Sequence, residues 1–256
     1  MSIKVENLSY SYPDLAVLKD LSFTAPEEKM LAVLGPNGVG KSTLFKCLLG
    51  LRPNYQGKIS LYDQDIKKLN PKELARHIAY IPQIERSSFH YTVKETVLMG
   101  TTAALGFFAQ PGLEQERRVE EVLTGLGLNH LIYRDFQTLS GGESKLVMLA
   151  RALVQGAKIL IMDEPTAALD YGNALRVMAI LQDLTKRGYT LLYSTHDPNQ
   201  ALNFSDSVLA LYDGEISAYG STEKVMTSEL LHRLYQVKVR IDQLEDGNRI
   251  CIPLEI

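Results

Sequence analysis

Residues 35–43, which read GPNGVGKST, constrain this chain more than any other segment. They follow the apolar run 30–34 and precede a helical pattern that starts at Leu44. A strand, a turn of the form G-x-x-x-x-G-K-[ST] and a helix together form a phosphate-binding loop, because glycines let backbone N–H groups converge on an anion at the positive end of the helix. The segment therefore predicts that the chain binds a nucleoside triphosphate.

The residue types within this loop indicate separate roles. Lys41 supplies a cation for the terminal phosphates, and the Ser42 hydroxyl is placed to bind Mg²⁺. A glycine-rich turn that fits by chance is the competing interpretation, which the flanking strand and helix disfavour. The other candidate nucleotide contacts in the loop are Gly35, Asn37, Gly38, Gly40 and Thr43.

Two carboxylates follow a second apolar run, residues 159–162. Ligands of open α/β sheets bind at the carboxyl ends of the strands, which is where Asp163 and Glu164 stand. Asp163 is the candidate Mg²⁺ group, and Glu164 is the candidate base that orients or deprotonates the attacking water. An acidic turn without function is the alternative, but the phosphate loop upstream favours catalysis.

The segment 138–143, which reads TLSGGE, precedes an amphipathic helix predicted over 143–155. Ser140 and the two glycines at this helix start predict a second anion site, with Ser140 and Gly142 as contacts. The competing interpretation is a capping box, in which Ser140 and Glu143 satisfy each other's hydrogen bonds. A capping box does not require two glycines, so both interpretations stay open.

The composition limits the classes of function. The 256 residues include 27 basic and 30 acidic residues, a net charge of −3 without long runs of one sign, which gives no electrostatic case for a nucleic-acid partner. Cys47 and Cys251 are expected to be packing residues in a reducing compartment. No apolar stretch approaches about 18 residues. The chain alone is therefore expected to be soluble and cytoplasmic, so other subunits would provide any membrane-spanning segments.

Apolar runs and helical patterns alternate along the chain and predict an α/β fold. The runs 159–162 and 191–193 are continuously apolar, as in a sheet covered on both faces. We expect a largely parallel sheet with flanking helices, preceded by an antiparallel β layer near the N-terminus. The predicted strands are 3–12, 17–23, 30–34, 58–62, 77–81, 158–162, 189–194 and 207–212.

Helical patterns replace the strand signals between about residues 92 and 150, which predicts an inserted helical subdomain. One predicted helical face carries Val119, Val122, Leu123 and Leu126. From about residue 221 to 256 the pattern predicts an extension, made of a short helix over 229–234 and a β hairpin around 245–248.

In order and spacing, segments 35–43, 139–143 and 159–164 resemble the phosphate loop, signature sequence and acidic strand of an ATP-binding-cassette (ABC) ATPase. The resemblance covers essentially the whole chain. It implies a single ATPase domain over residues 1–256, with a P-loop NTPase core, and it implies ATP and Mg²⁺ as cofactors.

The same resemblance implies roles for four further residues, each of which alone would be an ordinary strand or loop residue. Gln83 resembles the glutamine whose loop senses Mg²⁺ and water and contacts the membrane partner. His196 resembles the histidine that contacts the γ-phosphate, and Tyr12 the aromatic residue that stacks on adenine. Asp170 resembles the aspartate of the loop that crosses to the second subunit.

In this family the signature of one subunit closes on the ATP held by the other. The resemblance therefore implies a head-to-tail homodimer that ATP closes and hydrolysis reopens. After the signature, many relatives continue with Arg or Gln, whereas this chain has Ser144, Lys145 and Leu146. We expect this departure to affect fine tuning rather than activity.

Segments 92–100, 168–173, 195–201 and 250–253 are similar to importers of iron chelates, haem and cobalamin. This similarity implies a peripheral ATPase subunit at the cytoplasmic face of the cell membrane. Its implied partners are integral membrane permeases, a second copy of the chain and an extracytoplasmic substrate-binding protein. The alternative is a soluble ABC ATPase that acts in cofactor assembly.

Overall fold

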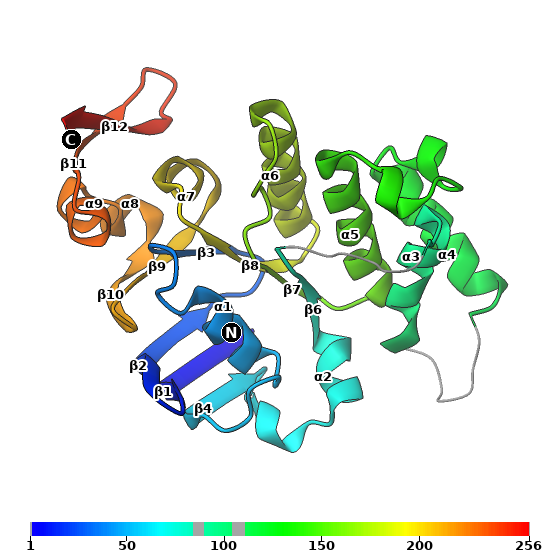
Figure 1. Ribbon diagram of the computed structural model, residues 1–256, viewed down its shortest axis with the longest axis horizontal. Helices are drawn as coiled ribbons and strands as arrows, with labels where there is room; N and C mark the ends of the chain where they lie inside the picture. The colour runs from blue at the N-terminus through cyan, green and yellow to red at the C-terminus, as the bar shows by residue number, and fades with distance from the viewer. Residues whose placement is uncertain (1, 84–89, 104–110, 256) are drawn as a thin grey trace. The chain divides into compact units, whose positions relative to one another are not determined.

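The computed structural model describes residues 2–83, 90–103 and 111–255 (Figure 1). The chain divides into two compact units, residues 1–68 with 182–256 and residues 69–181. None of the helices in the described ranges is both long enough and apolar enough to cross a membrane.

The first unit begins with an antiparallel sheet of strand order β2-β1-β4-β5 (Figure 1). Its strands are β1 (Ile3–Tyr12), β2 (Leu15–Ala25), β4 (Gln56–Leu61) and the short β5 (Gln64–Asp65). Alternating side chains of β1 are buried at Ile3 and Val5, as expected for a sheet that covers a core on one face. The predicted antiparallel layer is thereby confirmed.

The same unit contains a parallel core. Strand β3 (Met30–Leu34) pairs in parallel with β8 (Thr190–Thr195) on one side and with β9 (Ser207–Tyr212) on the other. Every residue of β3 and β8 is buried, which matches the prediction from continuous apolar runs. An antiparallel strand, β10 (Glu215–Ser221), continues the sheet beyond β9. The phosphate-loop segment leaves β3 and enters α1 (Lys41–Leu48).

The C-terminal part of this unit contains a hairpin where one is predicted. Helices α8 (Thr222–Val225) and α9 (Ser228–Tyr235) precede the antiparallel pair β11 (Lys238–Gln243) and β12 (Arg249–Glu255). The hairpin is attached to α7 (Pro198–Phe204), because the Asn199 side chain accepts a hydrogen bond from Cys251 N at 2.8 Å.

The second unit pairs two short parallel strands, β6 (Ile78–Ile81) and β7 (Ile159–Met162), with helices. The strand predicted from residue 77 begins one residue later, because His77 ends helix α2 (Pro71–His77), which has Asn70 as its capping residue. The other helices are α3 (Val93–Leu98), α4 (Leu113–Gly125), α5 (Gly141–Gln155) and α6 (Tyr171–Lys186), the last of which continues into the first unit.

Helices α3, α4 and α5 pack against one another, as the green helices in Figure 1 show. Their packing buries Val97, Val119, Leu123 and Val147, and burial of such side chains stabilises a subdomain by roughly 1.5–3 kcal/mol each. Of the helical face predicted on α4, Val119 and Leu123 are buried, whereas Val122 and Leu126 are half-buried. The helical character predicted for this region is thus present.

A close backbone approach in this subdomain requires a glycine. Gly100, in the 3₁₀ segment Met99–Ala103, lies against α5 so closely that a Cβ atom would clash with the backbone oxygen of Arg151. We therefore expect Gly100→Ala to destabilise the protein by about 1–3 kcal/mol, the range for overpacking a filled interior. Urea unfolding followed by circular dichroism measures the change.

Gly125→Ala is the matched control, because a Cβ at Gly125 meets no atom within 4 Å. It lies in α4, where alanine is the better helix former, so its stability should be equal or slightly higher. Equal stabilities of the two variants would contradict the steric role of Gly100.

Candidate nucleotide-binding and hydrolysis site

The phosphate loop is a glycine turn between a buried strand and a helix. Gly38 and Gly40 have φ angles of 80° and 110°, which L side chains rarely adopt, and Gly40 is the residue that precedes α1. A Cβ at Gly35 would lie 2.5 Å from the backbone oxygen of Leu211. The three glycines are therefore required by the backbone, and the helix start that they form presents N–H groups to an anion.

Lys41 is the first residue of α1 and is 6% exposed. Its ammonium group donates to the carbonyl oxygens of Gly35 at 2.7 Å and Pro36 at 3.0 Å. These bonds hold the cation over the loop that it follows. With its ammonium group fixed at the loop in this way, Lys41 is placed to form charge-assisted hydrogen bonds with phosphate oxygens. Ser42 and Thr43 follow it in the first turn.

The candidate adenine contact is linked to the same loop. The Tyr12 ring packs edge-on against Tyr10, with 5.2 Å between the ring centroids. Hydrogen bonds with Thr43 and then Arg52 lower the pKa of the Tyr12 hydroxyl. The Arg52 guanidinium also lies over the Tyr12 ring, 5.8 Å from its centroid, as in a cation–π contact. Arg52 thus contacts the candidate adenine-binding residue, although no sequence pattern singles it out.

The candidate γ-phosphate histidine follows the strand beside β3. In the parallel pairing, Leu34 is the partner of Thr195, so Gly35 and His196 are the first residues after two neighbouring strands. Asp197 N donates to Thr195 Oγ1 at 3.0 Å, and the Asp197 carboxylate caps α7 through Asn199 N at 2.8 Å. These bonds fix the backbone on which the exposed His196 is carried.

The second unit brings Gln83 and the two carboxylates together. Asp163 is 6% exposed, and its N–H donates to Ile81 O at 3.0 Å, which continues the pairing of β6 with β7. The Gln83 side-chain amide donates to Glu164 Oε2 at 2.9 Å. Glu164 has a φ of 46° and closes a turn by accepting a hydrogen bond from Ala167 N at 3.0 Å. A left-handed non-glycine residue beside a candidate reaction site is a common feature of strained functional turns.

Ser140 and Glu143 form the capping box that was one of the two interpretations of the signature segment. Ser140 N and Oγ donate to Glu143 Oε2 at 2.8 and 2.7 Å, and Glu143 N donates to Ser140 Oγ at 3.3 Å. These hydrogen bonds with Ser140 lower the pKa of Glu143. The capping box leaves the N–H groups of the two glycines outside its own bonds, so an anion site at this helix start stays a prediction.

Gly142 also has a packing role that the sequence did not indicate. A Cβ at this position would lie 2.8 Å from Asn173 Cγ. Asn173 in turn donates from its backbone N at 2.9 Å and its side-chain amide at 2.6 Å to the carboxylate of Asp170. Hydrogen bonds from the Asn173 backbone and side chain lower the pKa of Asp170. Ser140, Gly142 and Asp170 are thus linked within the second unit through the first turn of α5 and Asn173.

The predicted metal ligands have suitable donor chemistry for Mg²⁺. Ser42, Gln83 and Asp163 offer a hydroxyl, an amide oxygen and one carboxylate, and Mg²⁺ in phosphate sites takes few protein oxygens together with substrate phosphates. Over the described ranges, there is no cluster of three His, Cys, Asp or Glu side chains able to hold a metal ion. Each of these donors suits an ion that arrives with a nucleotide, and their binding of one common ion stays a prediction.

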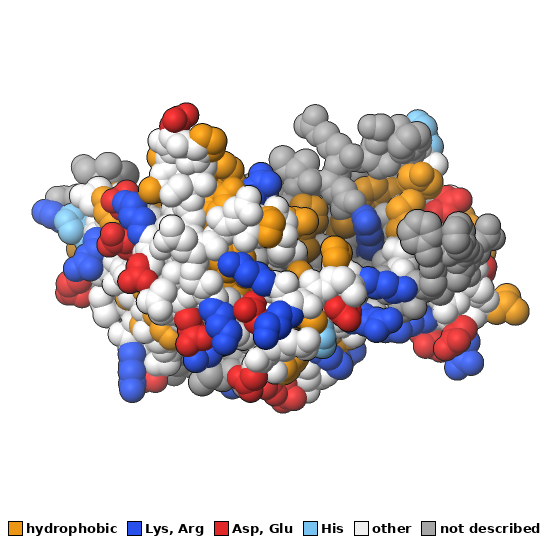
Figure 2. Space-filling model, turned by 90° about the horizontal axis from the view of Figure 1, so that it is seen from below, with side chains coloured by type: hydrophobic (Ala, Val, Ile, Leu, Met, Phe, Trp, Pro, Cys, Tyr) orange, Lys and Arg blue, Asp and Glu red, His pale blue; other side chains and the backbone are white. Residues whose placement is uncertain are grey.

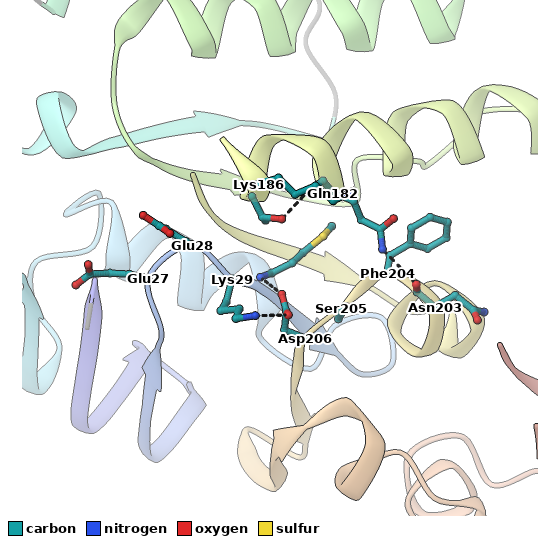
Figure 3. Close-up of a pocket in the computed structure, with 11 residues that line it drawn as sticks. Glu27, Glu28, Lys29, Gln182, Lys186, Asn203, Phe204, Ser205 and Asp206 are labelled. Atoms are coloured by element: carbon teal, nitrogen blue, oxygen red, sulfur yellow. Dashed lines mark hydrogen bonds and ion pairs between the residues drawn. The ribbon is translucent and has the colours of Figure 1, made fainter. Parts of the chain in front are cut away.

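A pocket of about 600 Å³ in the first unit lies away from the phosphate loop (Figure 3). It is at the amino ends of the parallel strands β3 and β9, whereas the loop follows the carboxyl end of β3. In it, Asp206 accepts hydrogen bonds from Lys29 Nζ at 3.0 Å and Met30 N at 2.8 Å. These bonds join two strand starts, so we interpret the pocket as structural.

Comparison with known proteins places the chain in a family. Residues 18–167 match the family model described as ABC transporter. The probable iron chelatin transport ATP-binding protein of Helicobacter pylori is 41% identical over 92% of this chain and 93% of its own length. The manganese transport system ATP-binding protein of Bacillus subtilis is 36% identical over 91% of this chain and 92% of its own length.

A solved structure described as an inward-facing, metal-chelate type ABC transporter is 34% identical to this chain. It has a TM-score of 0.88 and covers 99% of this chain and 97% of its own. The P-loop NTPase fold with an antiparallel N-terminal layer is thereby confirmed. ATPase subunits of this family dimerise and work with membrane permeases. The chain therefore belongs to the ABC transporter family, as an ATP-binding subunit that couples ATP hydrolysis to import across a membrane.

Proposed function

We propose that this chain powers the import of a metal chelate, in the class of iron chelates, haem and cobalamin. The observation that carries its catalytic part is the 2.9 Å hydrogen bond from Gln83 to Glu164, next to the buried Asp163. The Glu164 carboxylate, which can accept a proton, thus lies beside two groups suited to Mg²⁺, the Asp163 carboxylate and the Gln83 amide.

In the proposed mechanism, Lys41 and the N–H groups of the phosphate loop hold the terminal phosphates of ATP. Ser42, Asp163 and Gln83 would hold Mg²⁺, which would neutralise charge on the phosphate oxygens when bound. Glu164 accepts a proton from the attacking water, whose oxygen forms a bond to the γ-phosphorus. The bond between that phosphorus and the β–γ bridging oxygen breaks, and ADP leaves with its electron pair. His196 contacts the γ-phosphate from the strand end beside the loop, and Tyr12 stacks on adenine.

A second copy of the chain completes the proposed site. The start of its α5, with Ser140 and Gly142, faces the γ-phosphate, and its Asp170 loop crosses to the first subunit. A γ-phosphate held between Lys41 and this helix start joins the two subunits. Hydrolysis removes the joining group, so ATP binding closes the pair and hydrolysis reopens it.

The proposed assembly includes integral membrane permeases, an extracytoplasmic substrate-binding protein and this chain at the cytoplasmic face of the membrane. The iron chelatin and metal-chelate relatives support a chelate as cargo, and the reported relatives are transport proteins, which favours an importer over a soluble assembly factor. Acidic and basic side chains are interspersed on the face seen in Figure 2. The net charge of −3 likewise gives no electrostatic case for a nucleic-acid partner.

Lys41→Ala should weaken ATP binding by about 10-fold or more, because it removes a charge-assisted hydrogen bond to the phosphates. Titration with a fluorescent ATP analogue measures the affinity. Lys68→Ala, at an exposed lysine outside the loop, is the control and should bind as the parent does. Equal affinities of the two variants would remove Lys41 from the site.

Glu164→Gln should keep ATP affinity and lower turnover by about 10²–10⁴-fold, as expected for loss of a positioned base. The same variant should form dimers with Mg-ATP and remain monomeric without it, which light scattering measures. Hydrolysis at the parental rate would assign the base to another residue. A persistent monomer would mean that the permease is required to bring the two subunits together.

The cargo is tested by purifying the chain from its own cells with any multi-helix membrane protein that accompanies it. Proteoliposomes of the complex, supplied with the substrate-binding protein, should accumulate a ferric chelate, haem or cobalamin when ATP is present on the side of this chain. Accumulation of free Mn²⁺ in place of all three would reject the chelate class. Co-purification with a soluble assembly protein alone would reject the proposed assembly with a permease.

A further inference from the structure

Lys145, in α5, contacts the backbone that carries Gln83. Its ammonium group donates to Gln83 O at 2.5 Å and lies 3.4 Å from Pro82 O. Lys145 is half-buried, and it is part of the Ser144 to Leu146 segment that departs from the usual continuation of the signature. The departure therefore places a cation against the segment that follows β6.

A second hydrogen bond extends this contact to the candidate base. Gln83 accepts a hydrogen bond from Lys145 through its backbone carbonyl, and its side-chain amide donates to Glu164 Oε2 at 2.9 Å. Two hydrogen bonds thus connect Lys145 in helix α5, through Gln83, to the Glu164 carboxylate after β7. Because both bonds involve Gln83, the position of its backbone sets the position of its amide.

The backbone at Gln83 lies beyond the end of the strand pairing. The register of β6 with β7 ends at Ile81 and Met162, and the following bond is that of Asp163 N to Ile81 O. Gln83 is exposed and two residues past this point. A hydrogen bond from a charged donor is shorter and stronger than a neutral one, so Lys145 is suited to fix this part of the chain.

We propose that Lys145 is a positioning residue for ATP hydrolysis, which fixes the Gln83 backbone so that the Gln83 amide stays on the Glu164 carboxylate. It acts from the same helix that begins after Ser140, so it also connects the signature to the candidate base. The inference rests on the proposed role of Glu164 and adds a residue that acts on it through Gln83.

Lys145→Met tests the inference, because methionine keeps much of the side-chain length and cannot donate a hydrogen bond. Its kcat should fall by about 10- to 100-fold, the loss expected when a reacting group is displaced, while ATP affinity stays within about 2-fold of the parent. Retained affinity also shows that the variant is folded. If it is unstable, Lys145→Gln, which is too short to reach the same carbonyls, replaces it.

Lys145→Arg should restore most of the rate, since arginine is long enough and remains a charged donor. Lys94→Met is the matched control: the Lys94 ammonium is also hydrogen-bonded in the second unit, to Glu116 Oε2 at 2.8 Å, but it does not contact Gln83. Its kcat should equal that of the parent. A parental kcat in Lys145→Met would overturn the inference.

A double-mutant cycle separates positioning from a general structural effect. If Lys145 acts through Gln83, the Lys145→Met change should add little to the loss of kcat caused by Gln83→Ala. Multiplicative losses in the double variant would overturn the inference. Glu164→Gln is measured alongside: a parental rate there rejects the proposed base itself, whereas a slow Glu164→Gln with a normal Lys145→Met rejects only the role of Lys145.

Discussion

The parallel pairing of β3 with β8 is the constraint on which the nucleotide site depends. The strands are buried along their whole length, so their backbone groups must be paired with each other. This pairing sets Leu34 beside Thr195 and thereby brings the phosphate loop and His196 to one edge of the sheet, although many residues separate them in the chain. Short hydrogen bonds at Lys41 and Asp197 then fix the local direction of each segment.

The part of this arrangement that could be predicted from sequence is the part that local patterns specify. The continuous apolar run over β3, the glycines with positive φ and the lysine after them define the phosphate loop without any tertiary information. Local patterns specify the ends of elements less well. His77 is predicted as the first residue of a strand, but it is the last residue of α2, because the Asn70 cap and Pro71 start a helix that extends to it. Arg52 could not be found, since it acts on a residue distant in the chain and belongs to no fixed pattern. The sequence marks Lys145 as a departure after the signature, but its contact with Gln83 joins residues that are distant in the chain and could not be predicted.

The signature segment explains why two interpretations of one motif need not exclude each other. The capping box uses the Ser140 hydroxyl, the Glu143 carboxylate and two backbone N–H groups. It thereby leaves the glycine N–H groups for another acceptor, and it holds the first turn of α5 in a defined shape. Gly142 adds a separate constraint, because its missing side chain lets Asn173 approach and hold the Asp170 carboxylate. Local capping, packing and a nucleotide contact can thus require the same short sequence.

The proposed role of Lys145 identifies a position at which residue choice can change the hydrolysis rate without changing the reacting groups. The groups proposed to contact phosphate and water have strict geometric requirements, so Lys41, Asp163 and Glu164 leave little freedom. Gln83 is different, because its position depends on a backbone segment beyond the end of the β6–β7 ladder. The side chain that fixes this segment only has to reach two carbonyl oxygens from α5. Different residues after the signature can meet that requirement with different strength, so this position can set the hydrolysis rate while the reacting groups stay the same.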